Sequence, residues 1–349
     1  MKAWVLEDIG NIKYKEVLKP QISENEVLVQ VKAAGICGSD IPRIYQTGAH
    51  QMPLIPGHEF SGQVVQTGEN ADVKWQNKRV GIFPLIPCHN CVACQKGQYE
   101  LCRNYSYLGS RRDGGFAEYV AVPECNLIEL PENVSCEEAA MLEPMSVACH
   151  ALRRVKVSPD DTVAVCGLGT IGMFIVMLLL ERNVKNLLVI GNKAFQKEKI
   201  LRLGIKEEQY CDSKCENAES WLDKKTGGIG ADVFFECVGK NETCSLAINH
   251  AAPGGKVCLV GNPYSDMLLD KQVYWKILRN QLTVTGTWNS SFTGEVTDDW
   301  HMIVHLLKEK KIDPAQFISH CYRLEELDRG FEIMRDKSED YIKIMAVME

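Results

Sequence analysis

Four cysteines lie close together in the segment PCHNCVACQKGQYELC. Cys88, Cys91, Cys94 and Cys102 follow the spacing C-x2-C-x2-C-x7-C. Thiolates at these intervals can surround one tetrahedral zinc ion in a closed structural site. Disulfides would instead leave three neighbouring thiols with strained and competing pairings. The segment therefore predicts a lobe folded around a structural zinc.

A second, mixed set of metal-binding side chains lies upstream. Cys37 stands in GICGSD, and His58 and Glu59 stand in PGHEF. Three protein ligands with a fourth position open to water or substrate are typical of a catalytic zinc. Taken singly, the cysteine and the histidine read equally well as a buried core thiol and a hydrogen-bonded imidazole. Beside the four-cysteine lobe, the set predicts a second zinc, and we expect two zinc ions per chain.

The hydrophobic pattern divides the chain into two kinds of structure. A length of 349 residues suits two domains of ordinary size. Residues 1–150 contain short β-branched runs separated by Gly and Pro, which predict an antiparallel barrel with long loops. From about residue 157, strands alternate with helices, which predicts a doubly wound parallel sheet. We expect a catalytic domain from 1–150 and 290–349, a nucleotide domain from 151–289, and an active site between them.

A glycine-rich turn follows the first strand of the second part. In GLGTIG the glycines are spaced as G-x-G-x-x-G, between an apolar strand and an apolar helix. This context brings backbone amides and a helix N-terminus to a pyrophosphate, although a tight turn without a ligand is the alternative. The residues expected to contact the nucleotide are Gly167, Gly169, Thr170, Ile171 and Gly172, with Val238 and Val260 after two later strands.

The end of the next strand indicates which nucleotide binds. An acid there hydrogen-bonds the adenosine ribose and repels a 2′-phosphate. This chain has Gly191, Asn192 and Lys193 in that place, without an acid. We therefore expect NADP to be used at least as well as NAD, and an aspartate at position 191 to favour NAD. A lysine that merely faces solvent is the alternative reading of Lys193.

Composition excludes several classes of function. The net charge of -7 leaves no basic stripe for nucleic acid. The apolar run IGMFIVMLLL is too short to cross a membrane, so we expect no membrane partner. The start MKAWVLEDIG is unlike a secretion signal, and many cysteines lie scattered in apolar runs. A cytoplasmic location is therefore expected.

Over essentially its whole length the chain resembles the zinc-dependent medium-chain alcohol and polyol dehydrogenases. The resemblance rests on the GHE segment with Gly57, Gly62 and Gly68, on GGFAEY, on LEP and on GLGTIG. It implies a GroES-like β-barrel catalytic domain and a Rossmann domain. It also implies hydride transfer between a secondary alcohol of a polyol and a nicotinamide nucleotide.

The resemblance assigns roles to single residues. Cys37 and His58 would hold the catalytic zinc, and Glu59 would be a carboxylate ligand that alternates with water or substrate. Glu143 would face the same metal, or else cap the helix that follows it. Ser39 would pass the substrate proton outward. A family histidine that completes this relay is replaced by Pro42, so His50 or water would take its place.

The substrate is indicated by two loops and their cations. The segments most similar to the galactitol-1-phosphate dehydrogenase branch are GSDIPRIYQTGAH and GSRRDGGFAEY. Arg43, Arg111 and Arg112 lie in loops that the family places toward the zinc cleft. Guanidinium groups suit phosphate, although ordinary ion pairs would explain them equally well. An unphosphorylated polyol or a vicinal diol is the alternative substrate.

Two further expectations concern class and assembly. A zinc-stabilised nucleotide-binding protein without catalysis would keep the cysteine lobe but would not need the open ligand set. About two zinc ions per chain would indicate the dehydrogenase, and one or none would indicate the non-catalytic protein. The apolar runs GKVCLVG and LTVTGTW are expected to lie near a sheet edge and to join a homodimer or homotetramer.

Overall fold

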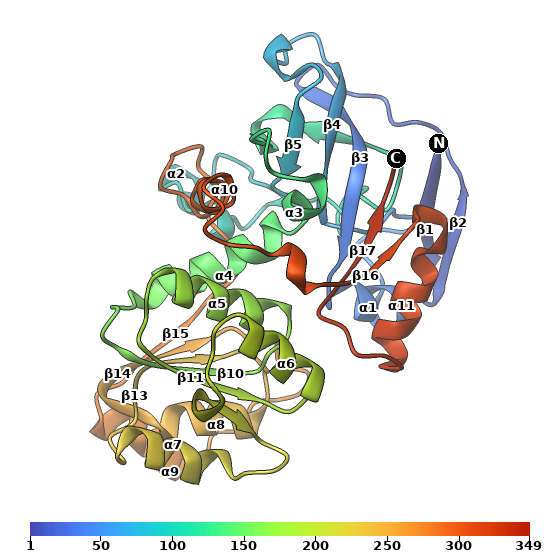
Figure 1. The fold of residues 1–349 in the computed structure, drawn as a ribbon. Helices are drawn as coiled ribbons and strands as arrows, with labels where there is room; N and C mark the ends of the chain where they lie inside the picture. The colour runs from blue at the N-terminus through green and yellow to red at the C-terminus, as the bar shows by residue number, and fades with distance from the viewer. The chain divides into compact units, whose positions relative to one another are not determined.

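The computed structural model describes residues 1–349 and divides them into two compact units (Figure 1). The first contains Met1–Ser146 and Ser290–Glu349, and the second contains Val147–Asn289. The boundary falls inside helix α4 (Leu142–Val155). No helix in the chain is both long enough and apolar enough to cross a membrane.

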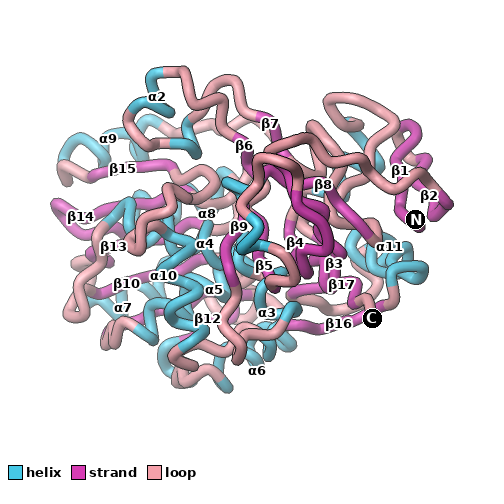
Figure 2. Tube along the Cα trace, turned by 90° about the horizontal axis from the view of Figure 1, so that it is seen from above, coloured by secondary structure: helices cyan, strands magenta, loops and turns pink.

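The first unit is built on a seven-stranded sheet in the order β16-β17-β3-β4-β5-β9, with β8 also paired to β3. Its pairs are antiparallel except β16 with β17. Figure 2 shows β17, β3 and β4 side by side, although β17 is far from the other two in the chain. The strands of this unit are β1 (Lys2–Asp8), β2 (Asn11–Glu16), β3 (Glu26–Ile36), β4 (Glu59–Thr67), β5 (Arg79–Ile82), β6 (Leu85–Ile86), β7 (Ser106–Tyr107), β8 (Tyr119–Pro123), β9 (Leu127–Glu129), β16 (Ile318–Tyr322) and β17 (Lys343–Val347).

Short helices lie in the connections between these strands. They are α1 (Asp40–Pro42), η1 (Arg43–Thr47), η2 (Val73–Trp75), α2 (Val92–Gln95), η3 (Tyr99–Leu101), η4 (Glu124–Asn126), α3 (Cys136–Ala140), α10 (Asp299–Lys308), η6 (Ala315–Phe317), η7 (Leu324–Glu326) and α11 (Leu327–Asp336). The core under α11 joins the two ends of the chain: the ring centroid of Phe331 lies 5.7 Å from that of Trp4 and 5.5 Å from that of Phe116. Burial of such aromatic groups fixes the C-terminal segment against β1.

The second unit contains a six-stranded sheet in the order β12-β11-β10-β13-β14-β15, with every pair parallel. Helices α5 and α6 cover one face, and α7, α8 and α9 cover the other (Figure 1). This arrangement is the doubly wound fold that the alternation of strands and helices predicted. Its elements are β10 (Thr162–Cys166), α5 (Thr170–Glu181), β11 (Asn186–Gly191), α6 (Ala194–Arg202), η5 (Glu207–Gln209), β12 (Tyr210–Asp212), α7 (Ala218–Thr226), β13 (Ala231–Glu236), α8 (Asn241–Asn249), β14 (Ala251–Leu259), α9 (Lys271–Arg279) and β15 (Thr283–Gly286).

The turn from β10 to α5 needs its glycines for different reasons. Gly167 has φ +98°, a conformation that side chains rarely adopt. A Cβ on Gly172 would lie 1.9 Å from the carbonyl oxygen of Gly167, so helix and turn touch there. A Cβ on Gly169 would meet nothing within 4 Å. The turn is therefore tightly packed on the side of Gly172 and open at Gly169.

Gly172→Ala is expected to destabilise the protein by about 2 kcal/mol, because the new methyl group overlaps backbone that cannot move aside. Helix propensity alone predicts the opposite effect, which is an increase in stability of up to about 1 kcal/mol. Thermal unfolding of the variant, with Gly169→Ala as the matched control in open space, measures the difference. A melting temperature above that of the wild type would show that the turn relaxes.

Candidate functional site

The predicted catalytic ligands come together where two strands pair. Cys37 follows β3, His58 immediately precedes β4, and Glu59 is the first residue of β4. The antiparallel register sets Gly35 opposite Glu59, which brings the three side chains to one point. Their metal-binding atoms all lie within 4.8 Å of one another. A thiolate, an imidazole and a carboxylate at this spacing fit zinc.

Gly35 leaves the space that the carboxylate occupies. A Cβ on Gly35 would stand 2.6 Å from Oε2 of Glu59. Gly57, just before the ligands, has φ +96° and packs against the ring of Phe116, where a Cβ would lie 2.6 Å from a ring carbon. Both glycines therefore allow the backbone to present His58 and Glu59 to the metal position.

A buried lysine contacts one member of this ligand set. Lys343, on β17, is 2% exposed and forms an ion pair with Oε2 of Glu59. Its Nζ also donates to the carbonyl oxygen of Ile36 at 3.2 Å. Burial alone would lower the pKa of Lys343, but the charges of Glu59 and Cys37 raise it, so the ammonium group is kept. The sequence analysis missed this residue, and its only signal is one Lys inside the apolar run YIKIMAV.

Asp40 orients the histidine. Its Oδ1 lies 3.4 Å from Nδ1 of His58, and its Oδ2 accepts a hydrogen bond of 3.0 Å from the backbone N–H of Cys37. The separation from Nδ1 is long for a hydrogen bond, so the pair acts mainly through charge. Burial opposes ionisation of Asp40, but the positive charge that His58 carries when protonated and the charge of Arg43 outweigh burial and lower the pKa of Asp40. A carboxylate behind Nδ1 leaves Nε2 as the metal-binding atom.

Glu143 lies beside this centre without joining the three-ligand cluster. Tyr107 donates a hydrogen bond of 3.2 Å to its Oε1, and the ring of Tyr107 lies 5.8 Å from that of His58. Burial, reinforced by the charge of Glu59, raises the pKa of Glu143 to about 7. The carboxylate is thus held near the metal position by a tyrosine that the sequence analysis did not select.

The two residues predicted to relay a proton differ in their surroundings. Ser39 is half-buried and precedes α1, two residues after Cys37. His50 is exposed in the bend after η1. No contact in the structure joins His50 to the metal ligands, and its relay role stays a prediction.

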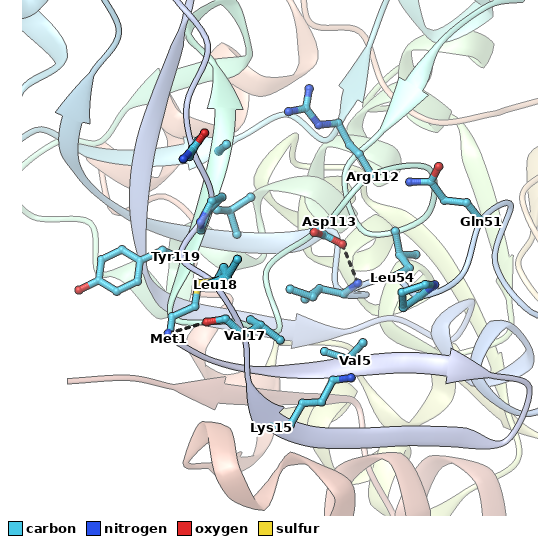
Figure 3. A pocket seen from close by; sticks show the side chains of 16 residues that line it. Met1, Val5, Lys15, Val17, Leu18, Gln51, Leu54, Arg112, Asp113 and Tyr119 are labelled. Atoms are coloured by element: carbon cyan, nitrogen blue, oxygen red, sulfur yellow. Dashed lines mark hydrogen bonds between the residues drawn. The ribbon is translucent and has the colours of Figure 1, made fainter.

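The three arginines occupy three different environments. Arg43 pairs with Asp40 and so adjoins His58. Arg111 lies over the ring of Tyr105, with its guanidinium carbon 4.4 Å from the ring centroid. Arg112 pairs with Glu26 and lines a cavity of about 500 Å³ whose walls contain no metal ligand (Figure 3). Neighbours in the sequence are therefore separated in the fold.

The four cysteines of the lobe converge on one point around α2. Sγ atoms lie 3.4 Å apart for Cys88 and Cys102, 3.5 Å for Cys91 and Cys94, and 4.0 Å for Cys88 and Cys94. Zn–S bonds in a tetrahedral site imply separations of about 3.8 Å. Hydrogen bonds from backbone N–H groups, that of Cys94 first, lower the pKa of Cys91 to about 6, which favours the thiolate that binds metal.

The nucleotide residues gather at the carboxyl ends of the parallel strands. Val238 packs against the glycine turn, where a Cβ on Gly167 would lie 2.6 Å from its Cγ2. Glu236 is buried and accepts hydrogen bonds of 2.8 Å from Val238 N and 2.9 Å from Gly239 N, which fixes the loop after β13. Its carbonyl oxygen accepts from the backbone of Val260 at 2.8 Å. With the open space at Gly169, this edge fits a dinucleotide, and Glu236 is a support that the sequence analysis missed.

Cys37→Ser is expected to reduce zinc from about two ions per chain to about one and to abolish turnover, with the fold and nucleotide binding kept. Cys94→Ser should instead lower the melting temperature, because a structural zinc contributes directly to folding. Metal analysis, melting curves and nucleotide titration of both variants provide the comparison. A Cys37→Ser protein with near wild-type turnover would refute the assignment.

Lys343→Met is expected to destabilise the metal-free protein by about 3 kcal/mol, because Glu59 is left buried without its cation. The loss should shrink when zinc is bound, since the ion supplies positive charge at the same carboxylate. Melting curves with and without a chelator test this. The double variant Lys343→Met/Glu59→Gln is the control and should recover stability. Equal melting temperatures for wild type and Lys343→Met without metal would contradict the proposed pairing.

Comparison with known proteins agrees with this architecture. A family model for the alcohol dehydrogenase GroES-like domain matches residues 23–132, and one for zinc-binding dehydrogenase matches residues 170–309. Galactitol 1-phosphate 5-dehydrogenase of Escherichia coli (strain K12) is 33% identical over 322 residues, 92% of each chain.

Solved structures extend the match to the whole chain. The crystal structure of galactitol-1-phosphate dehydrogenase from Escherichia coli has a TM-score of 0.92 and 31% identity, covering 100% of both chains. A protein of Sinorhizobium meliloti 1021, described as a zinc-binding dehydrogenase and bound to NADP, has a TM-score of 0.90 and 27% identity over 99% of both. By sequence and by fold, the chain belongs to the zinc-dependent, NAD(P)-linked medium-chain alcohol and polyol dehydrogenases.

Proposed function

We propose that the chain oxidises the secondary alcohol of a phosphorylated polyol similar to galactitol 1-phosphate. The observation that carries this proposal is a row of rings that runs from the zinc ligand His58 through Tyr107 and Tyr105 to the guanidinium group of Arg111. Ring centroids are 5.8 Å apart for His58 and Tyr107, and 6.1 Å apart for Tyr107 and Tyr105. A metal position and a cation are thus joined by one continuous set of contacts.

Arg111 has the chemistry of a phosphate-binding group. Its Nε is buried and makes no hydrogen bond in the structure, while its planar group lies over Tyr105. A buried donor without an acceptor is costly, and a phosphate oxygen would satisfy it. A guanidinium group held against an aromatic ring is also well suited to bidentate recognition. Arg43, beside the ligands through Asp40, adds a second positive charge.

The catalytic roles follow from the environment of each residue. Zinc at Cys37 and His58 would supply Lewis-acid polarisation of the alcohol, and the nicotinamide would supply the hydride acceptor. Asp40 holds the imidazole in one orientation. Glu59 would be a metal ligand that alternates with water or substrate, and Lys343 partly compensates its negative charge. Ser39 would receive the alcohol proton at its hydroxyl and pass it toward solvent.

Assembly and location complete the proposal. Strand β15 is an edge of the parallel sheet, and Trp275, Leu278 and Trp288 near it in the chain are 43%, 53% and 57% exposed. An exposed edge with large apolar side chains favours pairing with a second copy, so a homodimer or a tetramer is proposed. The fifteen cysteines form no disulfide, which supports a cytoplasmic enzyme.

Substrate choice is tested with a panel of polyols, vicinal diols and polyol phosphates. We expect kcat/KM for galactitol 1-phosphate or a close analogue to exceed that for the unphosphorylated polyol by about tenfold or more. Arg111→Ala should raise KM for the phosphate by about tenfold or more, since a charge-assisted hydrogen bond contributes on the order of 1.5 to 3 kcal/mol. The unphosphorylated polyol should be affected little.

Arg112→Ala is the matched control, because Arg112 is next to Arg111 in the sequence but pairs with Glu26. This variant should leave unchanged the ratio of kcat/KM for the phosphorylated polyol to kcat/KM for the unphosphorylated polyol. Preference for sorbitol or a butanediol over every phosphate in the panel would overturn the polyol-phosphate proposal while leaving the dehydrogenase family unaffected.

A further inference from the structure

A buried hydroxyl group without a partner lies at the nucleotide-binding edge of the parallel sheet. Tyr210 is the first residue of β12 and is 5% exposed, and its hydroxyl makes no hydrogen bond. In β12 it lies opposite Val189 of β11. Leaving a buried polar group unpaired costs free energy, so such a group calls for an explanation.

The hydroxyl occupies the space into which a side chain at position 191 would grow. A Cβ on Gly191 would lie 2.8 Å from the hydroxyl oxygen of Tyr210 and 2.9 Å from Cδ1 of Leu168. Leu168 is the second residue of the glycine turn. The tyrosine therefore reaches, from the neighbouring strand, the point between β11 and the turn where dinucleotide folds place their ribose-binding acid.

We propose that Tyr210 is a nucleotide-selecting residue, whose hydroxyl takes the place of that acid and donates a hydrogen bond to the 2′ substituent of the adenosine ribose. The hydroxyl of Tyr210 and Cδ1 of Leu168 both border the space beside Gly191, and the ribose would reach the hydroxyl through that space. This inference concerns the nucleotide alone and is independent of the substrate proposed above.

The protonation state of the tyrosine agrees with this role. Burial, together with the charge of Asp212, raises the pKa of Tyr210 to about 12, so the group is a neutral donor near pH 7. A neutral hydroxyl donates to a 2′-phosphate or to a 2′-hydroxyl, whereas a carboxylate in the same place repels the phosphate. The site is thereby open to NADP without the penalty that an acid would impose.

The same geometry adds a condition to the expectation that an aspartate at position 191 favours NAD. The side chain of an aspartate in place of Gly191 would have to displace the hydroxyl of Tyr210 and Cδ1 of Leu168, which would lie 2.8 Å and 2.9 Å from its Cβ. We therefore expect a full change of nucleotide preference to need both positions altered.

Tyr210→Phe removes the hydroxyl and keeps the ring. We expect the dissociation constant of NADPH, measured by fluorescence titration of the zinc-loaded enzyme without substrate, to rise by about tenfold, and that of NADH by about threefold or less. The melting temperature without nucleotide should stay equal or rise, because an unpaired buried hydroxyl has been removed. Tyr274→Phe, at an exposed tyrosine of α9, is the control and should change neither.

Two outcomes would overturn the inference. Unchanged affinity for both nucleotides would show that Tyr210 is only a core residue, and equal weakening of both, with a lower melting temperature, would show a purely structural role. A second measurement compares Gly191→Asp alone with Gly191→Asp/Tyr210→Ala. The single variant should melt lower and bind both nucleotides more weakly, and the double variant should bind NADH better than NADPH. A single variant that alone prefers NADH would refute the coupling of the two positions.

Discussion

The ion pair between Lys343 and Glu59 is the interaction on which the catalytic centre depends. Two opposite charges, both almost fully removed from water, are stable only as a pair with further hydrogen bonds. The pair joins β17 to β4 across β3, so the position of a metal ligand is set by the register of three strands. Any slip of one residue in that register would turn the lysine or the carboxylate to the other face of the sheet.

The residues around the predicted metal ligands also have charged or hydrogen-bonding partners. His58 has Asp40 behind it, Asp40 has Arg43, and Glu143 has the hydroxyl of Tyr107. Each of these three groups faces a specific partner, and these partners hold the ligands in one geometry. The nucleotide edge is organised differently, because there the absence of side chains at the glycines creates the site and one carboxylate, Glu236, ties down the surrounding loop.

The features that the sequence predicted are those encoded within short segments. The cysteine lobe, the GHE segment and the glycine turn each place their chemistry within a few residues, and the strand-helix alternation predicts the parallel sheet. Lys343 could not be found in this way, because it reaches Glu59 through the pairing of strands that are distant in the chain. Tyr210 could not be found either, because its place beside Gly191 depends on how the consecutive strands β11 and β12 pair, which no short motif encodes. Arg111 and Arg112 are adjacent and chemically identical in the sequence, and only the fold shows that one lies on Tyr105 and the other on Glu26.

The two metal sites differ in how far apart their partner residues lie in the sequence, and this difference has a consequence for biosynthesis. Cys88 and Cys102 are 14 residues apart, so the lobe can close around an ion soon after it leaves the ribosome. Glu59 and Lys343 are 284 residues apart. The Cys37, His58 and Glu59 site therefore gains the positive charge of Lys343 only when β17 has been synthesised and has paired with β3. During synthesis, the nascent chain therefore carries an unneutralised carboxylate among its ligands. The negative charge of Glu59 can therefore be balanced by its lysine only after nearly the whole chain has been synthesised.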